Sequence, residues 1–218
     1  MKKYIAALAL LVSASGASAA NILVNGDFEA GNLSGWTNVT GRVYVDNNNG
    51  TGTPVSNRAT PINANGGSFF AVGDMSGGGS EILLQSFTVT GEPVTVSFDW
   101  FNNSYTGQSG TTLSGSQSNR VDILAAGANA YDVGAGVVAN LLLNQTSSSW
   151  QSALFTLNLA AGSYQFRFGS STCCFFQNFG IDNVSVSEAT AEVPEPAMIA
   201  LFGLGAAALG LGRRRKAA

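Results

Sequence analysis

The 218-residue chain has no histidine and only two cysteines. Without an imidazole it cannot build a Ser–His or Cys–His nucleophilic centre, and most zinc sites lose a principal ligand. The Gly77–Gly79 run lacks the strand, helix and lysine that a phosphate-binding or dinucleotide-binding loop requires. A polysaccharide hydrolase that uses two carboxylates stays a distant alternative, with Asp99 paired to Asp122 or Glu81. We therefore expect a protein that is not an enzyme.

Charge is also scarce, at 11% of residues against roughly 25% in ordinary soluble domains. Between Asn21 and Gly212 the chain has 13 acidic residues, four arginines and no lysine, a net of nine negative charges. Such an exterior repels nucleic acid. It is compatible with neutral polysaccharide, with divalent cations and with solubility outside the cell.

The N-terminus has the pattern of a secretory signal peptide. Lys2 and Lys3 precede the apolar run Ile5–Val12 and the small residues Ser13–Ala20. The apolar run is too short to cross a bilayer, and small residues of this kind precede a cleavage site. We predict a signal peptide at 1–19, cut after Ala19, followed by an ectodomain at 20–190.

The C-terminus, 191–218, combines a short motif, an apolar stretch and a basic end. The apolar stretch, 197–212, has 16 residues, or about 24 Å of helix against a hydrocarbon core of about 30 Å. It is expected to form a marginal transmembrane helix whose terminal cations stay in the cytoplasm, so that the ectodomain is exported. The motif before it is Val193, Pro194, Glu195 and Pro196, and the basic end is Arg213, Arg214, Arg215 and Lys216.

This order of parts resembles the PEP-CTERM sorting signal. The resemblance implies that an exosortase in the inner membrane of a Gram-negative bacterium recognises the tail and cuts near the motif. The chain would then be the substrate: first a membrane-anchored precursor, then a protein of the cell surface or extracellular matrix.

The ectodomain has the texture of a β-protein. Residues 94–100 alternate, with valines, Phe98 and Trp100 on one face and polar side chains on the other. Only Ala125–Asn140 resembles a helix, and its glycines argue against one. The pattern predicts an all-β antiparallel sandwich. The expected strands are Ser80–Thr90, Pro93–Phe101, Ser149–Leu159, Ser163–Gly169 and Gly180–Glu188.

The opening 25–29 (Asn-Gly-Asp-Phe-Glu) and the closing 181–184 (Ile-Asp-Asn-Val) resemble the galactose-binding-like jelly roll, a fold shared by carbohydrate-binding modules. The resemblance implies that the first and last strands lie side by side. It also implies one structural calcium ion, held by Glu29 and Asp182 with oxygens near Asn25 or Asp27. The alternative is that both acids are solvated or cap turns.

Glycan binding would need an exposed aromatic ring for stacking, and several aromatic residues lie in or beside loop-like stretches. Each could instead pack under its loop, and Trp100 and Trp150 are expected in the core. The candidates are Trp36, Tyr44, Tyr105, Tyr131, Phe175 and Phe176.

Cys173 and Cys174 are adjacent. Neighbouring Cα atoms lie about 3.8 Å apart, below the usual minimum of about 4.4 Å for a disulfide. In an oxidising compartment a strained bridge, intermolecular disulfides and free thiols all stay open.

Two classes of function fit these patterns. The first is a glycan-associating module of extracellular polysaccharide or biofilm. The second is a structural matrix protein without a small ligand. Saturable glycan binding would favour the first, and self-association without a glycan would favour the second.

Overall fold

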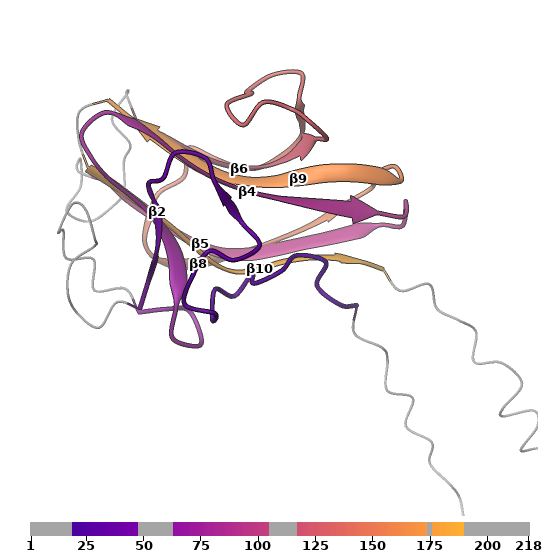
Figure 1. Ribbon diagram of the computed structural model, residues 1–218, viewed down its shortest axis with the longest axis horizontal. Coiled ribbons are helices and arrows are strands. Elements are labelled where there is room, and N and C mark those ends of the chain that lie inside the picture. The colour runs from indigo at the N-terminus through magenta and orange to yellow at the C-terminus, as the bar shows by residue number, and fades with distance from the viewer. Residues whose placement is uncertain (1–18, 48–62, 105–116, 174–175, 190–218) are drawn as a thin grey trace, which may run out of the picture.

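A computed structural model describes residues 19–47, 63–104, 117–173 and 176–189. Every regular element in these ranges is a β-strand. The ranges contain no helix that could cross a membrane. Ten strands form two five-stranded antiparallel sheets that pack face to face (Figure 1). The predicted all-β sandwich is confirmed. The signal peptide up to residue 18 and the whole sorting tail lie outside the described residues.

Strands from distant parts of the chain alternate within each sheet. Sheet A has the order β1 (Thr37–Asn38), β4 (Gly79–Val89), β9 (Gly162–Thr172), β6 (Ser118–Ala125) and β7 (Val137–Leu143). Sheet B has the order β2 (Val43–Asp46), β3 (Phe70–Ser76), β10 (Phe176–Glu188), β5 (Val94–Ser104) and β8 (Ser147–Leu157).

The core lies between the sheets and follows from alternation along each strand. From β5, Val96, Phe98 and Trp100 point inward, where Phe166 and Phe168 of β9 meet them. Each such side chain contributes about 1.5–3 kcal/mol by leaving water. The alternate residues of each strand therefore form two outer faces, one on each sheet.

The interior becomes polar at the end of the sandwich where β10 begins. Gln177 donates from Nε2 to Asn102 Oδ1 at 3.2 Å, and Asn102 donates from Nδ2 to the Gln145 carbonyl at 3.0 Å. Nearby, the buried Glu81 accepts a hydrogen bond from the Ser170 hydroxyl. Burial, followed by the negative charge of Asp74, holds the pKa of Glu81 well above its usual range.

The N-terminal segment lies against β10, although it forms no strand of its own. The Ile22 amide donates to the Val186 carbonyl at 2.7 Å, and the Val184 amide donates to the Gly26 carbonyl at 2.8 Å. A Cβ at Gly26 would lie 2.0 Å from the Val184 oxygen, so this approach requires glycine. The beginning and end of the domain are thus side by side, as in a jelly roll.

Candidate functional site

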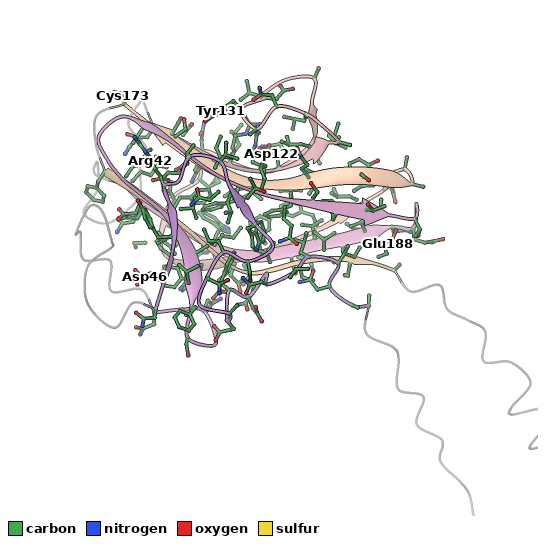
Figure 2. All side chains as sticks on the ribbon, in the orientation of Figure 1. Arg42, Asp46, Asp122, Tyr131, Cys173 and Glu188 are labelled. Carbon is green, nitrogen blue, oxygen red and sulfur yellow. The ribbon has the colours of Figure 1, made fainter. Side chains whose placement is uncertain are left out.

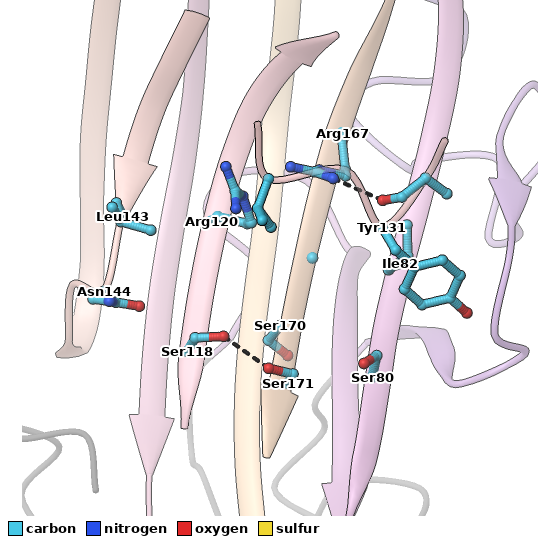
Figure 3. A pocket seen from close by; sticks show the side chains of 13 residues that line it. Ser80, Ile82, Ser118, Arg120, Tyr131, Leu143, Asn144, Arg167, Ser170 and Ser171 are labelled. Atoms are coloured by element: carbon cyan, nitrogen blue, oxygen red, sulfur yellow. Dashed lines mark hydrogen bonds between the residues drawn. The ribbon is translucent and has the colours of Figure 1, made fainter. Parts of the chain in front are cut away.

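A groove of about 170 Å³ lies on the outer face of sheet A (Figure 3). The loop between β6 and β7, residues 126–136, folds back over this face. Its Ala128 and Ala130 pack on an apolar cluster of Ile82, Leu84 and Leu124. The groove runs beside this loop. Its lining is formed by Ser80, Ile82, Ser118, Arg120, Ala130, Tyr131, Val133, Leu143, Asn144, Arg167, Gly169, Ser170 and Ser171.

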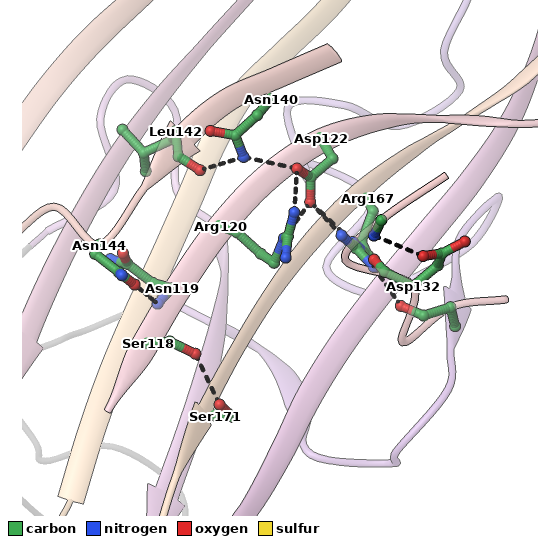
Figure 4. A network of polar contacts seen from close by, with 12 residues as sticks. Ser118, Asn119, Arg120, Asp122, Asp132, Asn140, Leu142, Asn144, Arg167 and Ser171 are labelled. Atoms are coloured by element: carbon green, nitrogen blue, oxygen red, sulfur yellow. Dashed lines mark hydrogen bonds and ion pairs between the residues drawn. The ribbon is translucent and has the colours of Figure 1, made fainter. Parts of the chain in front are cut away.

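A buried carboxylate, Asp122, organises the base of the groove (Figure 4). Arg120 donates to it from Nε at 2.7 Å and from Nη2 at 2.9 Å. Arg167 donates from Nε at 3.0 Å, and Asn140 donates from Nδ2 at 2.7 Å. Asp122 therefore accepts hydrogen bonds on both oxygens and holds both arginines in fixed positions.

The second role of Arg167 is to fix the 126–136 loop. Its Nη1 donates to the Ala130 carbonyl at 2.7 Å and to the Asp132 carbonyl at 2.6 Å. The Asp132 carboxylate accepts from the Gly134 and Gly136 amides at 2.7 and 2.9 Å. The Gly134 hydrogen bond is the main reason why the pKa of Asp132 is lowered. The loop is thus held both to the sheet and to itself.

This arrangement presents Tyr131 at the groove. Its backbone lies between the two carbonyls that Arg167 binds, and its amide donates to Asn129 Oδ1 at 2.8 Å. The side chain is 55% exposed, and its ring stands beside Ile82 at the groove (Figure 3). The structure therefore offers a largely exposed aromatic ring on a fixed backbone.

The other predicted stacking residues lie elsewhere. Trp36 is a core residue: it packs between Phe28 and Phe166, with ring centroids 5.5 and 5.9 Å away, and donates from Nε1 to the Asn25 carbonyl at 3.0 Å. Its ring is buried, so it cannot stack on a ligand. Of the remaining candidates, Tyr44 and Phe176 are partly buried, in β2 and at the start of β10, and Tyr105 and Phe175 lie outside the described residues.

The outer face of sheet B is occupied by an aromatic cluster. Phe70, Phe101 and Trp150 meet edge to face, with centroids 4.8–5.8 Å apart. The Trp150 indole donates to the Asn63 carbonyl at 2.7 Å. Trp100 belongs to the core, as predicted, whereas Trp150 packs on the outside of sheet B. Phe70 and Phe101 are fully buried there, and Trp150 is partly buried.

Three carboxylates gather on this same face beside residues 65–69. The buried Asp182 accepts from the Asn65 amide at 3.0 Å, and Glu29 accepts from the Ser68 and Phe69 amides at 2.7 and 2.9 Å. Burial raises the pKa of Asp182 to about 7, and the negative charges of Asp99 and Glu29 add to the rise. Glu29 and Asp182 are thus held by one segment of chain.

The structure shows other roles for Asn25 and Asp27. Asn25 Oδ1 accepts from the Ala30 amide at 3.3 Å, and Asp27 Oδ1 accepts from the Glu29 amide at 3.4 Å. Both side chains therefore stabilise their own loop. The sequence did not single out Asp99 for a metal. Asn183 links it to Asp182: its Nδ2 donates to Asp99 Oδ2 at 2.9 Å, and its amide donates to Asp182 Oδ1 at 2.8 Å. Over the described ranges no group of three His, Cys, Asp or Glu residues is arranged to hold a metal.

The three carboxylates considered for a hydrolase lie in different parts of the sandwich and differ in burial. Asp99 lies on the outer face of sheet B, where it accepts from Ser152 Oγ at 2.5 Å. Glu81 points into the sandwich interior, and Asp122 is buried under the groove of sheet A. No pair of these three shares a surface, so they cannot act together on one glycosidic bond.

Cys173, at the end of β9, is disulfide-bonded. Cys174 lies outside the described residues, as do the sorting motif and the basic end.

Residues 192–216 match the family model of the PEP-CTERM protein-sorting motif. This match confirms the resemblance of the C-terminal tail and indicates an exported surface protein that an exosortase processes. A search of curated protein sequences finds no match.

A solved carbohydrate-binding module shares the fold, and two others give weaker matches. The TmCBM61 module, in complex with β-1,4-galactotriose, matches with a TM-score of 0.53 at 15% identity, over 78% of this chain and 99% of the module. A family 16 carbohydrate-binding module-2 matches at 0.49 and 19% identity, over 77% and 100%. The CBM22-1 xylan-binding domain of Paenibacillus barcinonensis Xyn10C matches at 0.46 and 18%, over 81% and 99%.

Proposed function

We propose that this exported protein binds glycan in the groove on the outer face of sheet A. The observation that carries the proposal is Tyr131, a ring left 55% exposed although its backbone is fixed on both sides by Arg167. An aromatic ring on a rigid mount loses little conformational freedom when a ligand stacks on it. That property suits a binding surface better than a loop that merely covers the sheet.

The groove also carries the polar groups that sugar hydroxyls need. Ser118 Oγ and Ser171 Oγ lie 2.8 Å apart, and Asn144 and Ser80 stand at the rim. Hydroxyl and amide groups both donate and accept, so they can adapt to the hydroxyl pattern of a sugar. A few polar groups around an apolar and aromatic surface is the usual composition of a ligand site.

The shared fold with TmCBM61, a module solved with β-1,4-galactotriose, supports the same reading. The resemblance lies in the sandwich, at 15% identity, and does not identify the sugar. A role in biofilm or exopolysaccharide follows from combining this binding with the export that the sorting motif indicates.

The test compares wild type with Tyr131→Ala and Tyr131→Phe in residues 20–190, on a glycan array followed by calorimetry. We expect Tyr131→Ala to weaken binding about tenfold, or about 1.4 kcal/mol. Tyr131→Phe keeps the ring and should keep most of the affinity. Wild-type protein that retains no glycan would overturn the proposal, as would equal binding by all three proteins.

Calcium is a second, separate proposal for the opposite face. The expected ligands are the carboxylates of Glu29 and Asp182, with Asp99 near enough to Asp182 to interact with it. Carboxylate oxygens of this kind suit a hard cation. A carboxylate whose pKa burial raises to about 7 would gain from a neighbouring positive charge. We expect calcium to raise the melting temperature, chelator to reverse the rise, and Asp182→Asn to abolish it. An identical melting temperature with calcium and with chelator would contradict the calcium proposal.

A specific observation also favours a matrix-building role. Residues 133–166, which include both β7 and β8, contain no charged residue. β8 is an edge strand, and its Leu154 is 72% exposed. Edge strands usually carry charges, prolines or bulges that prevent pairing with another chain. In a protein that is otherwise acidic, this uncharged edge is where two copies could approach with least repulsion.

The matrix-building alternative is therefore self-association through β8. Sedimentation velocity of residues 20–190 should show concentration-dependent association. Leu154→Lys places a charge on the edge and should make the protein monomeric, whereas Val39→Lys changes an exposed residue outside β7 and β8 and should not. Monomeric wild type at high concentration would argue against this role.

A further inference from the structure

The groove is electrostatically unlike the rest of the protein. The described residues carry eleven acidic side chains and three arginines. Two of those three arginines, Arg120 and Arg167, line the groove, and no carboxylate is among the lining residues. Asp122 lies beneath the surface, with a fully buried side chain. A ligand in this groove therefore meets cations in a protein that is acidic elsewhere.

The two arginines are not equivalent. Arg167 uses Nε, Nη1 and Nη2 in bonds to Asp122 and to two loop carbonyls, and its side chain is only 2% exposed. It is a strut for the 126–136 loop. Arg120 uses only Nε and Nη2, both toward Asp122, and its side chain is 18% exposed. Among the described residues no group accepts from Arg120 Nη1.

Arg120 is therefore held by one edge and free at the other. A guanidinium has five N–H groups, so two bonds to Asp122 leave three. The two arginines share the single charge of Asp122, and the negative charge of Asp132 also interacts with Arg167. Within the described ranges, Arg120 is paired with Asp122 alone, so its positive charge is the less compensated of the two. The nearest other acid of the loop, Asp132, directs its carboxylate to the Gly134 and Gly136 amides and does not line the groove.

We propose that the glycan bound here is acidic, and that Arg120 binds a carboxylate on a uronic acid residue while Tyr131 stacks on the same or the adjacent sugar. The inference rests on the proposed glycan-binding function and specifies its ligand. A guanidinium edge with free N–H groups matches a carboxylate in shape and charge, which an ammonium group does not. The acidic remainder of the protein opposes this binding weakly, because charges beyond about 8 Å are largely screened at physiological salt.

The experiment uses a matched pair of ligands: an oligogalacturonate and the same oligosaccharide after reduction of its carboxyl groups. Wild type, Arg120→Gln and Arg120→Lys are titrated with each by calorimetry at low and at physiological salt. We expect wild type to prefer the acidic form about tenfold or more, with a preference that falls as salt rises. Arg120→Gln should lose the preference, and Arg120→Lys should keep only part of it.

Arg42→Gln is the control, because it removes one positive charge from a side chain that does not line the groove. It should leave the preference unchanged. Melting curves establish that each variant is folded, and Arg120→Lys covers the case in which Arg120→Gln is not.

The outcomes separate the two proposals. Equal binding of the acidic and the reduced oligosaccharide, or binding of neutral glycans alone on an array that holds both kinds, overturns the acidic ligand and leaves glycan binding intact. No binding to any glycan on that array overturns both. An acid preference that survives in Arg120→Gln overturns the role of Arg120.

Discussion

The two outer faces of the sandwich are built from the same kind of strand but have opposite character. Over sheet A, a loop tied down by Arg167 leaves a groove lined by arginines, with the Tyr131 ring exposed. Over sheet B, Phe70 and Phe101 are buried beneath a partly buried Trp150 that bonds to Asn63, and the carboxylates of Asp99 and Asp182 lie on the same face. The fold alone therefore does not decide which face can take a ligand.

The difference between the faces comes from the contacts that the outward side chains of each sheet make. On sheet B, the Phe101 ring packs closely against Gly180, and Trp150 contacts Phe101 edge to face. On sheet A, the 126–136 loop is bound by Arg167 through two of its carbonyls, and the groove beside the loop stays uncovered. One face is sealed by packing, and the other is held open by an ion pair.

The largest effect is expected from breaking the ion pair under the open face. Asp122→Ala removes the carboxylate from the buried Arg167 and should cost about 3–5 kcal/mol of unfolding free energy. Urea denaturation measures this. Asp132→Ala removes a partly buried carboxylate of the 126–136 loop, which among the described residues pairs only with backbone amides of that loop, and should cost far less. A loss below about 1 kcal/mol for Asp122→Ala would mean that the ion pair does not hold this face.

The sealed face should be sensitive to volume instead of charge. A Cβ at Gly180 would lie 2.0 Å from the Phe101 ring, so Gly180→Ala must displace that ring and should cost about 1–3 kcal/mol. The matched control is Gly134→Ala in the open-face loop, where a Cβ meets nothing closer than 3.6 Å. Similar denaturation midpoints for the two variants would contradict the packing of Phe101 on Gly180.

Between the faces, Glu81 gives a pH-dependent test. Its folded-state pKa is raised, mainly by burial, so the folded protein binds the proton more tightly than the unfolded chain. Its contribution to stability is complete below the unfolded pKa, about 4.5, and is lost as pH rises through the folded pKa. Glu81→Gln cannot ionise, so its melting temperature should rise relative to wild type as pH increases above 4.5. A constant difference from pH 4 to 8 would contradict the raised pKa.

The smallest expected effect concerns the loop itself. Asp132→Ala frees the Gly134 and Gly136 amides, which should then exchange their hydrogens faster while the exchange of β6 amides stays unchanged. Native-state hydrogen exchange measures both in one sample. Unaltered exchange at the two glycines would show that Arg167 alone holds the loop, and would sharpen the contrast between the two faces.

The sequence predicted the strands in which apolar and polar residues alternate. The five expected strands correspond to β4, β5, β8, β9 and β10. The sequence did not indicate β3, because it is buried over most of its length and so lacks the regular polar positions that mark a period of two. It did not indicate β6 either, although Arg120 and Asp122 alternate there with Val121 and Ile123. β7 begins inside the glycine-containing stretch 125–140 that looked most like a helix and extends three residues beyond it.

The candidate site was accessible only in part. Tyr131 stood out as an aromatic residue in a loop, but nothing in its neighbours distinguished it from Trp36, which is buried. The Asp122–Arg167 pair depends on the register of β6 against β9, which joins residues 45 positions apart. The one local signal was Arg120 two residues before Asp122, on the same side of a strand.

The position of β10 has a mechanical consequence. This strand lies in the middle of sheet B, bonded to β3 on one side and β5 on the other, and its last residue, Glu188, leads toward the sorting motif (Figures 1 and 2). A pull through that end runs along the strand, so it shears both rows of backbone hydrogen bonds at once and does not unzip them singly. Force exerted on a captured ligand would thus be resisted by the whole sheet, with the N-terminal segment at Val184 and Val186 as a further clamp.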